Sequence, residues 1–158
     1  MEENTPISER ENVLRFAAAH FRGAMQYDDL LREKILNQPV PNIDRKDARK
    51  FQRLLRTSDA LSLLLVIWKG TAVEQLVPFQ SGPSPLNAHG LAVTLAEHPA
   101  DVAKITSRIR EFSIAAEAYG LLKRLDGHQK LVKLEATPLL EEFLVELARR
   151  NLHDTAAS

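Results

Sequence analysis

The chain contains no cysteine and no long apolar run. The absence of thiols excludes a disulfide framework, a thiol redox sensor and a zinc site with cysteine ligands. The longest apolar run, Leu63 to Trp68, is far shorter than the roughly 20 residues that a membrane-spanning helix needs. The opening residues, MEENTPISERE, are acidic and polar, whereas a secretory signal is basic and then apolar. These features predict a cytoplasmic protein without a membrane partner.

Motifs of enzymes and metal sites are scarce as well. The five histidines form no i, i+4 pair and no HExxH arrangement; they are His20, His89, His98, His128 and His153. There is neither a glycine-rich phosphate loop nor a GxSxG phrase. The pair Glu141-Glu142 falls in the first turn of an expected helix, where carboxylates stabilise the helix dipole. We therefore expect no enzymatic activity, no metal and no cofactor.

The formal net charge of this 158-residue chain is zero, which argues against coating nucleic acid through bulk electrostatics. Two stretches are nevertheless locally basic, each with a surplus of four cations. The cations are Arg45, Lys46, Arg49, Lys50, Arg53 and Arg56 in the first stretch, and Lys104, Arg108, Arg110, Lys123, Arg124, Lys130 and Lys133 in the second. The ordinary interpretation of the first stretch is a solvated helix face, and its functional alternative is a second surface for DNA or an acidic partner.

The N-terminal part, about residues 1–76 of a single domain, is predicted to be helical. Apolar spacing from Ser8 to about Asn37 predicts one long helix or two, with Gly23 as a possible break. After the breaker QPVPN, Asp44 can cap a helix that carries the first basic stretch on its outer faces. The apolar stripe of that helix contains Ala48, Phe51, Leu54 and Leu55.

The next segment, SDALSLLLVIWKG, is apolar on nearly every side and predicts a central buried helix. Thr57 or Ser58 is its expected N-cap, and Gly70 is its expected C-terminal stop. The proline-rich phrase VPFQSGPSP, Val77 to Pro85, then predicts a loop within the domain.

From Asn87 the pattern changes to a short helix, a turn, a longer helix and a hairpin. Asn87 can cap a helix from His89 to about Glu97, and Pro99 separates it from a helix over Asp101 to about Ala118. The apolar residues of the longer helix step by three and four; they are Val102, Ile105, Ile109, Phe112, Ala116 and Tyr119. The expected terminator of this helix is Gly120.

A β-hairpin is predicted after that glycine. The runs LLKRL and KLVKLEA are joined around Asp126-Gly127, a dipeptide that accepts the positive φ angles of a tight turn. Thr137-Pro138 then supplies an N-cap and a first-turn proline for a C-terminal helix over about 138–150. The fold class expected from this order is mainly α with one β-hairpin, a winged helix-turn-helix over about 87–137 flanked by N- and C-terminal helices.

The phrases TSRIREF (106–112), AEAYGLLKR (116–124) and DGHQKLVKLEATPLLEEF (126–143) carry a family likeness. From about Asn87 to Phe143 the chain resembles winged-helix transcriptional regulators of the MarR type. That resemblance implies a homodimer that binds double-stranded DNA, with the helix around 101–118 in the major groove and the hairpin 121–136 as a wing.

Helical geometry predicts which side chains would contact DNA. With the apolar stripe turned to the core, the opposite face presents Lys104, Ser107, Arg108 and Glu111, with Thr106 and Arg110 on a flank. Base edges are bound by short polar and long basic side chains of this kind. The wing would bring His128, Lys130 and Arg124 to phosphates. The plain alternative for the helix face is solvation.

Three further expectations concern partners. Dimer candidates are apolar residues near both ends of the chain, although their ordinary interpretation is intramolecular core: Phe16, Phe21, Tyr27, Leu30, Leu139, Leu140, Phe143, Leu144 and Leu147. A small-molecule effector, if one exists, would find Trp68, Phe79 and Tyr119 as pocket lining. The alternative function is a helical protein–protein interaction module that has a winged-helix shape and does not bind DNA.

Overall fold

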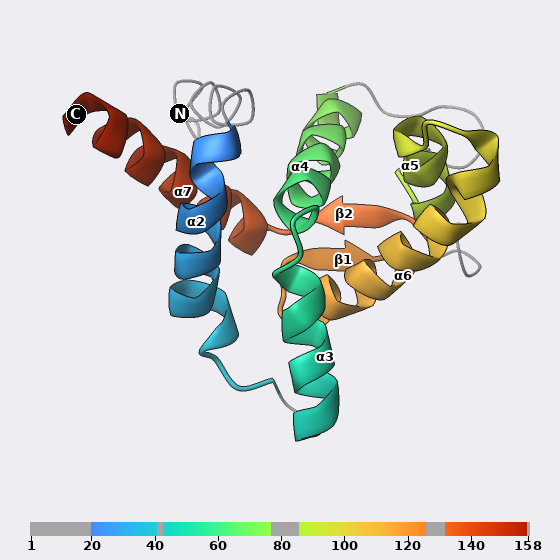
Figure 1. The fold of residues 1–158 in the computed structure, drawn as a ribbon, viewed down its shortest axis with the longest axis horizontal. Coiled ribbons are helices and arrows are strands. Elements are labelled where there is room, and N and C mark those ends of the chain that lie inside the picture. The colour runs from blue at the N-terminus through green and yellow to red at the C-terminus, as the bar shows by residue number, and fades with distance from the viewer. Residues whose placement is uncertain (1–19, 41–42, 77–85, 126–131, 158) are drawn as a thin grey trace.

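The structure is a computed structural model that describes residues 20–40, 43–76, 86–125 and 132–157 (Figure 1). It is mainly helical, with one two-stranded antiparallel sheet. In chain order the elements are α2 (His20–Leu31), η1 (Arg32–Leu36, one π-helical turn), α3 (Arg45–Leu55), α4 (Ala60–Leu76), α5 (Ala88–Leu95), η2 (Pro99–Asp101, a 3-10 turn), α6 (Val102–Ala118), β1 (Leu122–Arg124), β2 (Leu134–Ala136) and α7 (Pro138–Ala157). Within these ranges, no helix has the length and apolar character needed to cross a membrane.

The central helix is α4, as its uniformly apolar sequence predicts. It contributes a continuous group of buried side chains: Ala60, Leu61, Leu64, Leu65, Ile67 and Trp68. The start of this helix differs from the prediction, because the Thr57 hydroxyl donates to the Leu54 carbonyl at 3.1 Å and so lies against the end of α3. Burying one leucine of this kind stabilises the fold by roughly 1.5–3 kcal/mol, so α4 dominates the core.

The prediction that Gly70 ends this helix is wrong, since α4 continues to Leu76. The glycine has a packing role instead. A Cβ at position 70 would lie 2.9 Å from Cδ1 of Leu86, and Leu86 is buried. Gly70 therefore allows the segment that leads into α5 to approach α4 closely. Similarly, α2 passes through Gly23 without a break.

Three predicted helix starts are confirmed by side-chain caps. The carboxylate of Asp44 accepts a hydrogen bond from Asp47 N at 2.8 Å, and Asn87 Oδ1 accepts one from Gly90 N at 2.7 Å. Thr137 Oγ1 accepts from Leu140 N at 3.3 Å and also contacts the Gly120 carbonyl, to which it donates at 2.6 Å. Each cap satisfies a backbone N–H group that the first helical turn leaves without a partner.

The end of α6 is confirmed at Gly120, which has a φ of 80°. Gly120 N donates to Glu117 O at 3.0 Å, and Leu121 N donates to Ala116 O at 2.9 Å. This pair of bonds is the Schellman arrangement, in which glycine adopts the left-handed conformation without a side-chain penalty. The chain turns there from α6 directly into β1.

The two strands form an antiparallel ribbon that lies between α4 and α6 (Figure 1). Its register pairs Leu122 with Ala136 and Arg124 with Leu134. The predicted turn at Asp126-Gly127 lies outside the described residues. An isolated pair of strands is only marginally stable, so the ribbon depends on contacts with the helices. One such contact is the hydrogen bond that Ala136 N donates to the Thr71 hydroxyl of α4 at 2.9 Å.

The segment before α5 also pairs with the ribbon. Leu134 N donates to the Leu86 carbonyl at 2.8 Å, and Asn87 forms an antiparallel bridge with Lys133. The ribbon is thus extended by a single bridge residue, Asn87, from a third segment of the chain. This arrangement fixes α5, α6 and the ribbon relative to one another.

A separate pair of helices, α2 and α7, packs together on the other side of α4 (Figure 1). The rings of Tyr27 and Phe143 meet edge to face, with centroids 5.7 Å apart. The Tyr27 hydroxyl donates to the Leu55 carbonyl at 2.6 Å, which ties α2 to the end of α3. Burial, with the nearby Asp28 carboxylate, raises the pKa of Tyr27 well above its ordinary value. Because α2, its continuation η1 and α7 form a structural unit, they are called the α2/α7 arm below.

Candidate nucleic-acid interface

The helix α6 buries one side and leaves the other open. Its buried residues are Thr106, Ile109, Phe112, Ser113, Ala115 and Ala116. The exposed side includes Lys104, Ser107, Arg108 and Glu111, the four residues that helical geometry assigns to it. The first two turns of this open face therefore combine two cations with a short hydroxyl side chain.

Thr106 belongs to the buried side, contrary to its predicted place on an accessible flank. Its side chain is 5% exposed, and its hydroxyl donates to the Val102 carbonyl at 2.7 Å. The position follows from helix geometry, because Thr106 lies one turn before Ile109 and two turns before Ser113, both of which are buried. Thr106 is not available to contact DNA.

Arg108 is exposed but faces the start of α4. With Asp59, Ser62 and Leu63 it lines a hollow of about 300 Å³, whose other walls are Leu95, Ile105 and Ile109. Arg108 has no ion-pair partner among the described residues. Its guanidinium therefore lies at the border between α6 and the N-terminal end of α4.

Arg110 and Arg124 are half-buried, and Arg124 is partly neutralised. The Glu117 carboxylate accepts from Arg124 N at 2.9 Å and lies 4.0 Å from Arg124 Nη1. The Nε atoms of Arg110 and Arg124 are buried, with no hydrogen-bond partner in the described part of the chain. These two arginines are less free to reach a phosphate than Lys104.

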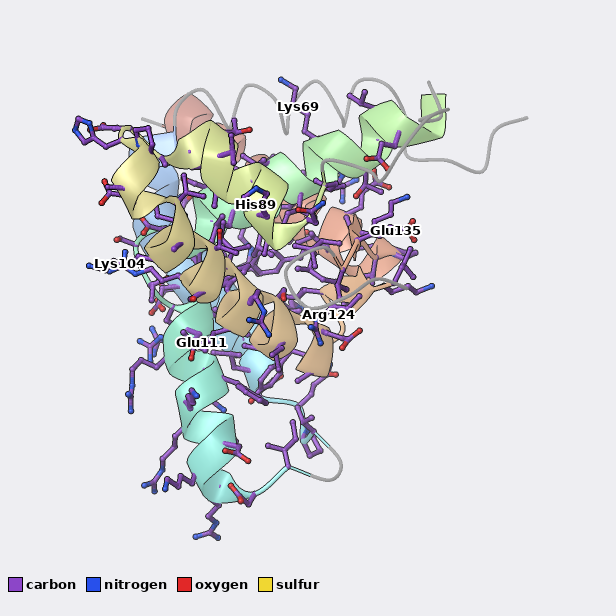
Figure 2. All side chains as sticks on the ribbon, turned by 90° about the vertical axis from the view of Figure 1, so that its right-hand side faces the viewer. Lys69, His89, Lys104, Glu111, Arg124 and Glu135 are labelled. Carbon is purple, nitrogen blue, oxygen red and sulfur yellow. The ribbon has the colours of Figure 1, made fainter. Side chains whose placement is uncertain are left out.

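Lys104 lies at the N-terminal end of α6, whereas Arg124 lies in β1, beyond the C-terminal end of that helix (Figure 2). The open face of the helix runs between them and also carries Glu111, Ile114 and Glu117, so the C-terminal half is acidic and apolar. The predicted wing residues His128 and Lys130 lie outside the described residues. The structure thus concentrates the accessible cations of α6 at its N-terminal half.

The sequence did not indicate that α3 lies directly beside α6. Lys50 Nζ of α3 is 3.9 Å from the Glu111 carboxylate, and Gln52 Nε2 donates to the Tyr119 hydroxyl at 3.1 Å. Both contacts join helices more than 50 positions apart in the chain, so no local pattern could reveal them. The charge of α3 was visible in the sequence, but its place next to α6 was not.

The cations of α3 occupy one face of that helix. Helical periodicity places all six on one side and the stripe of Ala48, Phe51, Leu54 and Leu55 on the other, which packs against the core. Two of the six have a partner: Lys50 has Glu111, and Arg56 has Asp28. The remaining four, Arg45, Lys46, Arg49 and Arg53, are exposed, and their side chains have no ion pair or hydrogen bond among the described residues.

The residues predicted for a dimer surface are largely used within one chain. Tyr27, Leu30, Leu140, Phe143, Leu144 and Leu147 are all buried in the core, whereas Leu139 is 38% exposed. The side chains of Phe16 and Phe21 lie outside those that the structure describes. The α2/α7 arm is therefore mainly an intramolecular packing unit.

Two of the residues suggested for an effector pocket have hydrogen-bond partners on different helices. Trp68 Nε1 donates to Glu141 at 3.2 Å, whereas Tyr119 bonds to Gln52 of α3. Phe79 lies outside the described residues. One hollow on the described surface is the hollow at Arg108, and another, of about 320 Å³, lies between α2, η1 and α7. Neither includes Trp68 or Tyr119.

Across the described ranges, no group of three or more histidine, aspartate or glutamate residues is arranged to hold a metal ion. The open face of α6 and the cations of α3 are thus the main chemical features of this side of the molecule. No protein-family model, no curated protein and no solved structure matches the chain.

Proposed function

We propose that this protein binds double-stranded DNA through a winged helix-turn-helix of the kind found in transcriptional regulators. In this proposal α5 and α6 are the two helices of the helix-turn-helix, and the β1–β2 ribbon is the wing. The N-terminal half of α6 enters the major groove. Lys104, Ser107 and Arg108 are the side chains that contact the DNA there.

One observation carries the proposal: α6 is anchored on one side and open on the other, with two cations and a hydroxyl on its first two open turns. A major groove about 12 Å wide accepts one helix, and base edges are bound by the hydrogen-bonding groups of such side chains. Lys104 projects freely at the N-terminal end (Figure 2), where recognition helices make their base contacts.

The position of the ribbon supports the same proposal. It follows α6 after the tight turn at Gly120 and is held between α4 and α6 by the Thr71 and Leu86 hydrogen bonds. A ribbon fixed in this way is rigid relative to α6. It can therefore contact a phosphate backbone beside the groove that α6 occupies.

A salt series tests the proposal. We expect the protein to bind a labelled random duplex at 50 mM NaCl, with an affinity that falls linearly on a log–log plot as salt rises. On random duplex, where specific base contacts are not formed, Lys104→Ala and Arg108→Ala should each lower the steepness of that plot by about 1, because each removes one cation that neutralises phosphate charge beside the groove. Fluorescence anisotropy at five or six salt concentrations measures this.

Lys34→Ala is the matched control, because Lys34 is an exposed lysine of η1 in the α2/α7 arm. It should leave the steepness unchanged. Absence of duplex binding by the wild-type protein at 50 mM NaCl would remove the proposal. Equal effects of Lys34→Ala and Lys104→Ala would remove the role of α6.

A second candidate is a protein–protein interaction module with the same shape and no DNA binding. The C-terminal half of the open α6 face favours it, because Ile114 is 38% exposed there between Glu111 and Glu117. Ile114→Asp discriminates between the two candidates. It should abolish binding of a protein partner centred on that half, while the salt-dependent affinity for duplex should change little.

The proposal includes a homodimer, because one such helix contacts few base pairs and regulators of this kind bind two half-sites. The described apolar stripes of α2 and α7 are buried within one chain, so most of their area is not available to a second copy. Light scattering of the purified protein, with and without duplex, measures the number of chains directly.

A further inference from the structure

We infer that the cationic face of α3 is a second DNA-contacting surface, which binds the phosphate backbone of the duplex next to the groove occupied by α6. This inference rests on the proposed function and adds a partner surface to it. The residues are Arg45, Lys46, Arg49 and Arg53. They provide affinity and contribute nothing to the choice of sequence, because phosphates are the same at every base pair.

The four cations of α3 include repulsive contacts, although Asp44 at the N-cap, Asp47 in the first turn and Arg53 in the last turn favour the helix dipole. Arg45 and Lys46 occupy the first turn, where the positive end of the helix dipole disfavours cations. Arg45 and Arg49, like Arg49 and Arg53, are one turn apart, and like charges at that spacing repel each other. A helix face selected only for solvation is better served by acids alternating with these cations.

The other two cations of this segment have acid partners. Arg56 at the end of α3 makes two hydrogen bonds to Asp28, at 2.7 and 3.1 Å. Lys50 lies 3.9 Å from Glu111, so it offsets the acid nearest to α3 on the open face of α6. The four remaining cations have no such partner in the described part of the chain, and their charge is available to an anion.

The packing and length of α3 favour duplex phosphates over a lipid surface as the anion. A basic amphipathic helix binds a lipid surface by burying its apolar face in the membrane. In α3 that face is already used, because Leu55 is fully buried and Phe51 and Leu54 pack against the core. What remains is a row of cations over 11 residues, roughly 16 Å long. That length matches several successive phosphates of a duplex strand, which are about 3.4 Å per base pair apart along the axis.

The position of α3 beside α6 places its cations along the path of the duplex. α3 contacts the C-terminal half of α6, where Lys50 lies 3.9 Å from Glu111 and Gln52 Nε2 donates to the Tyr119 hydroxyl at 3.1 Å (Figure 1). A duplex that lies along the open face of α6 from Lys104 to Glu111 therefore brings its backbone close to α3. The two basic stretches, separated by about 50 residues in the chain, thus form neighbouring parts of one surface.

The test is a variant with Arg45→Gln, Lys46→Gln, Arg49→Gln and Arg53→Gln, measured in the full chain against random duplex. We expect its affinity at 50 mM NaCl to fall by on the order of 100-fold. The slope of the log of its affinity against the log of the salt concentration should become less steep by about 3 to 4. The ranking of duplexes of different sequence should stay as in the wild type. A variant with Arg45→Lys, Arg49→Lys and Arg53→Lys keeps the charges and should keep the slope.

The matched control removes four cations elsewhere: Arg32→Gln, Lys34→Gln, Lys69→Gln and Arg149→Gln. A loss of slope in the α3 variant with little change in this control supports the inference. An unchanged slope in the α3 variant, or an equal loss of slope in the control, overturns the inference about α3 while leaving DNA binding by α6 intact.

The two proposals can also be told apart. If the α3 variant loses slope and Lys104→Ala has no effect, the role of α3 is supported and the role proposed for α6 fails. Binding of the wild type to phosphatidylserine vesicles, with none to duplex, overturns both.

Discussion

The α2/α7 arm and the α3/α6 side of the molecule use charge in opposite ways. In the arm, Arg32 pairs with Asp28 and Asp29 at 3.2 and 2.8 Å, and Arg150 pairs with Glu33 and Glu146, each at 3.0 Å. On α3 four neighbouring cations have no partner in the described residues. Cations that are matched by acids of the same chain stabilise a fold modestly. Cations that are left together carry a charge that only an external anion can offset.

Because of this difference, the net charge of zero is a poor guide to whether the protein binds an anionic partner. Acids and cations are equal in number over the whole chain, but Asp29, Glu33 and Glu146 of the arm lie against its own arginines. The surplus on α3 therefore remains local. Within a Debye length, about 10 Å at 0.1 M salt, a ligand experiences that local surplus rather than the total.

The largest expected effect concerns the arm. Phe143→Ala should lower the free energy of unfolding by about 3–5 kcal/mol, because it removes a buried ring in edge-to-face contact with Tyr27. Urea titration measures this loss. The folded variant should bind duplex with wild-type affinity, and Phe143→Leu serves as the milder control if the alanine variant is too unstable. A weaker affinity in the folded Phe143→Leu variant would contradict the separation between arm and interface.

A smaller effect of opposite sign is expected on α3. The four-glutamine variant should be more stable than the wild type by on the order of 1 kcal/mol at low salt, because it removes repulsion between cations one turn apart. The gain should largely disappear at 0.5 M NaCl, where surface charges are screened. Urea titrations at 20 mM and 500 mM NaCl measure both values. A loss of stability would show that these cations support the fold.

The smallest effect is expected at the ion pair that joins the arm to α3. Hydrogen bonds from Arg56, with the charges of Arg56 and Arg32, hold the pKa of Asp28 below its ordinary value. The stability that this carboxylate contributes is therefore present above about pH 4 and is lost as the pH falls through the lowered pKa.

Asp28→Asn tests this expectation. The variant should be slightly less stable than the wild type at pH 7, and the difference should shrink towards pH 2. Urea midpoints at both values measure it. A difference that stays constant with pH would show that Asp28 acts through packing or uncharged hydrogen bonds.

Local patterns predicted much of the secondary structure. The bounds of α6, the caps at Asp44, Asn87 and Thr137, and the terminator at Gly120 depend on residues within one or two turns of each other. Gly70 shows where this approach fails. In sequence it has the signature of a helix end, but its role is to admit Leu86, a residue 16 positions later whose approach no local pattern records.

The candidate interface was predictable to a lesser degree. Lys104, Ser107 and Arg108 are exposed, as the helical period requires, whereas Thr106 is buried because α6 packs over a wider arc than its apolar stripe suggests. The grouping of α3 with α6 was beyond prediction, since it depends on Lys50 with Glu111 and Gln52 with Tyr119, contacts between distant segments.

The sequence by itself determined the helices, their caps, the ribbon and the charge of each face, because these follow from the spacing of residues that are neighbours in the chain. Only the tertiary structure decided which charged faces lie together and which cations gain an acid partner from a distant segment. Those outcomes depend on how apolar stripes from distant segments pack around α4, which places Arg150 beside Glu33 and Arg56 beside Asp28.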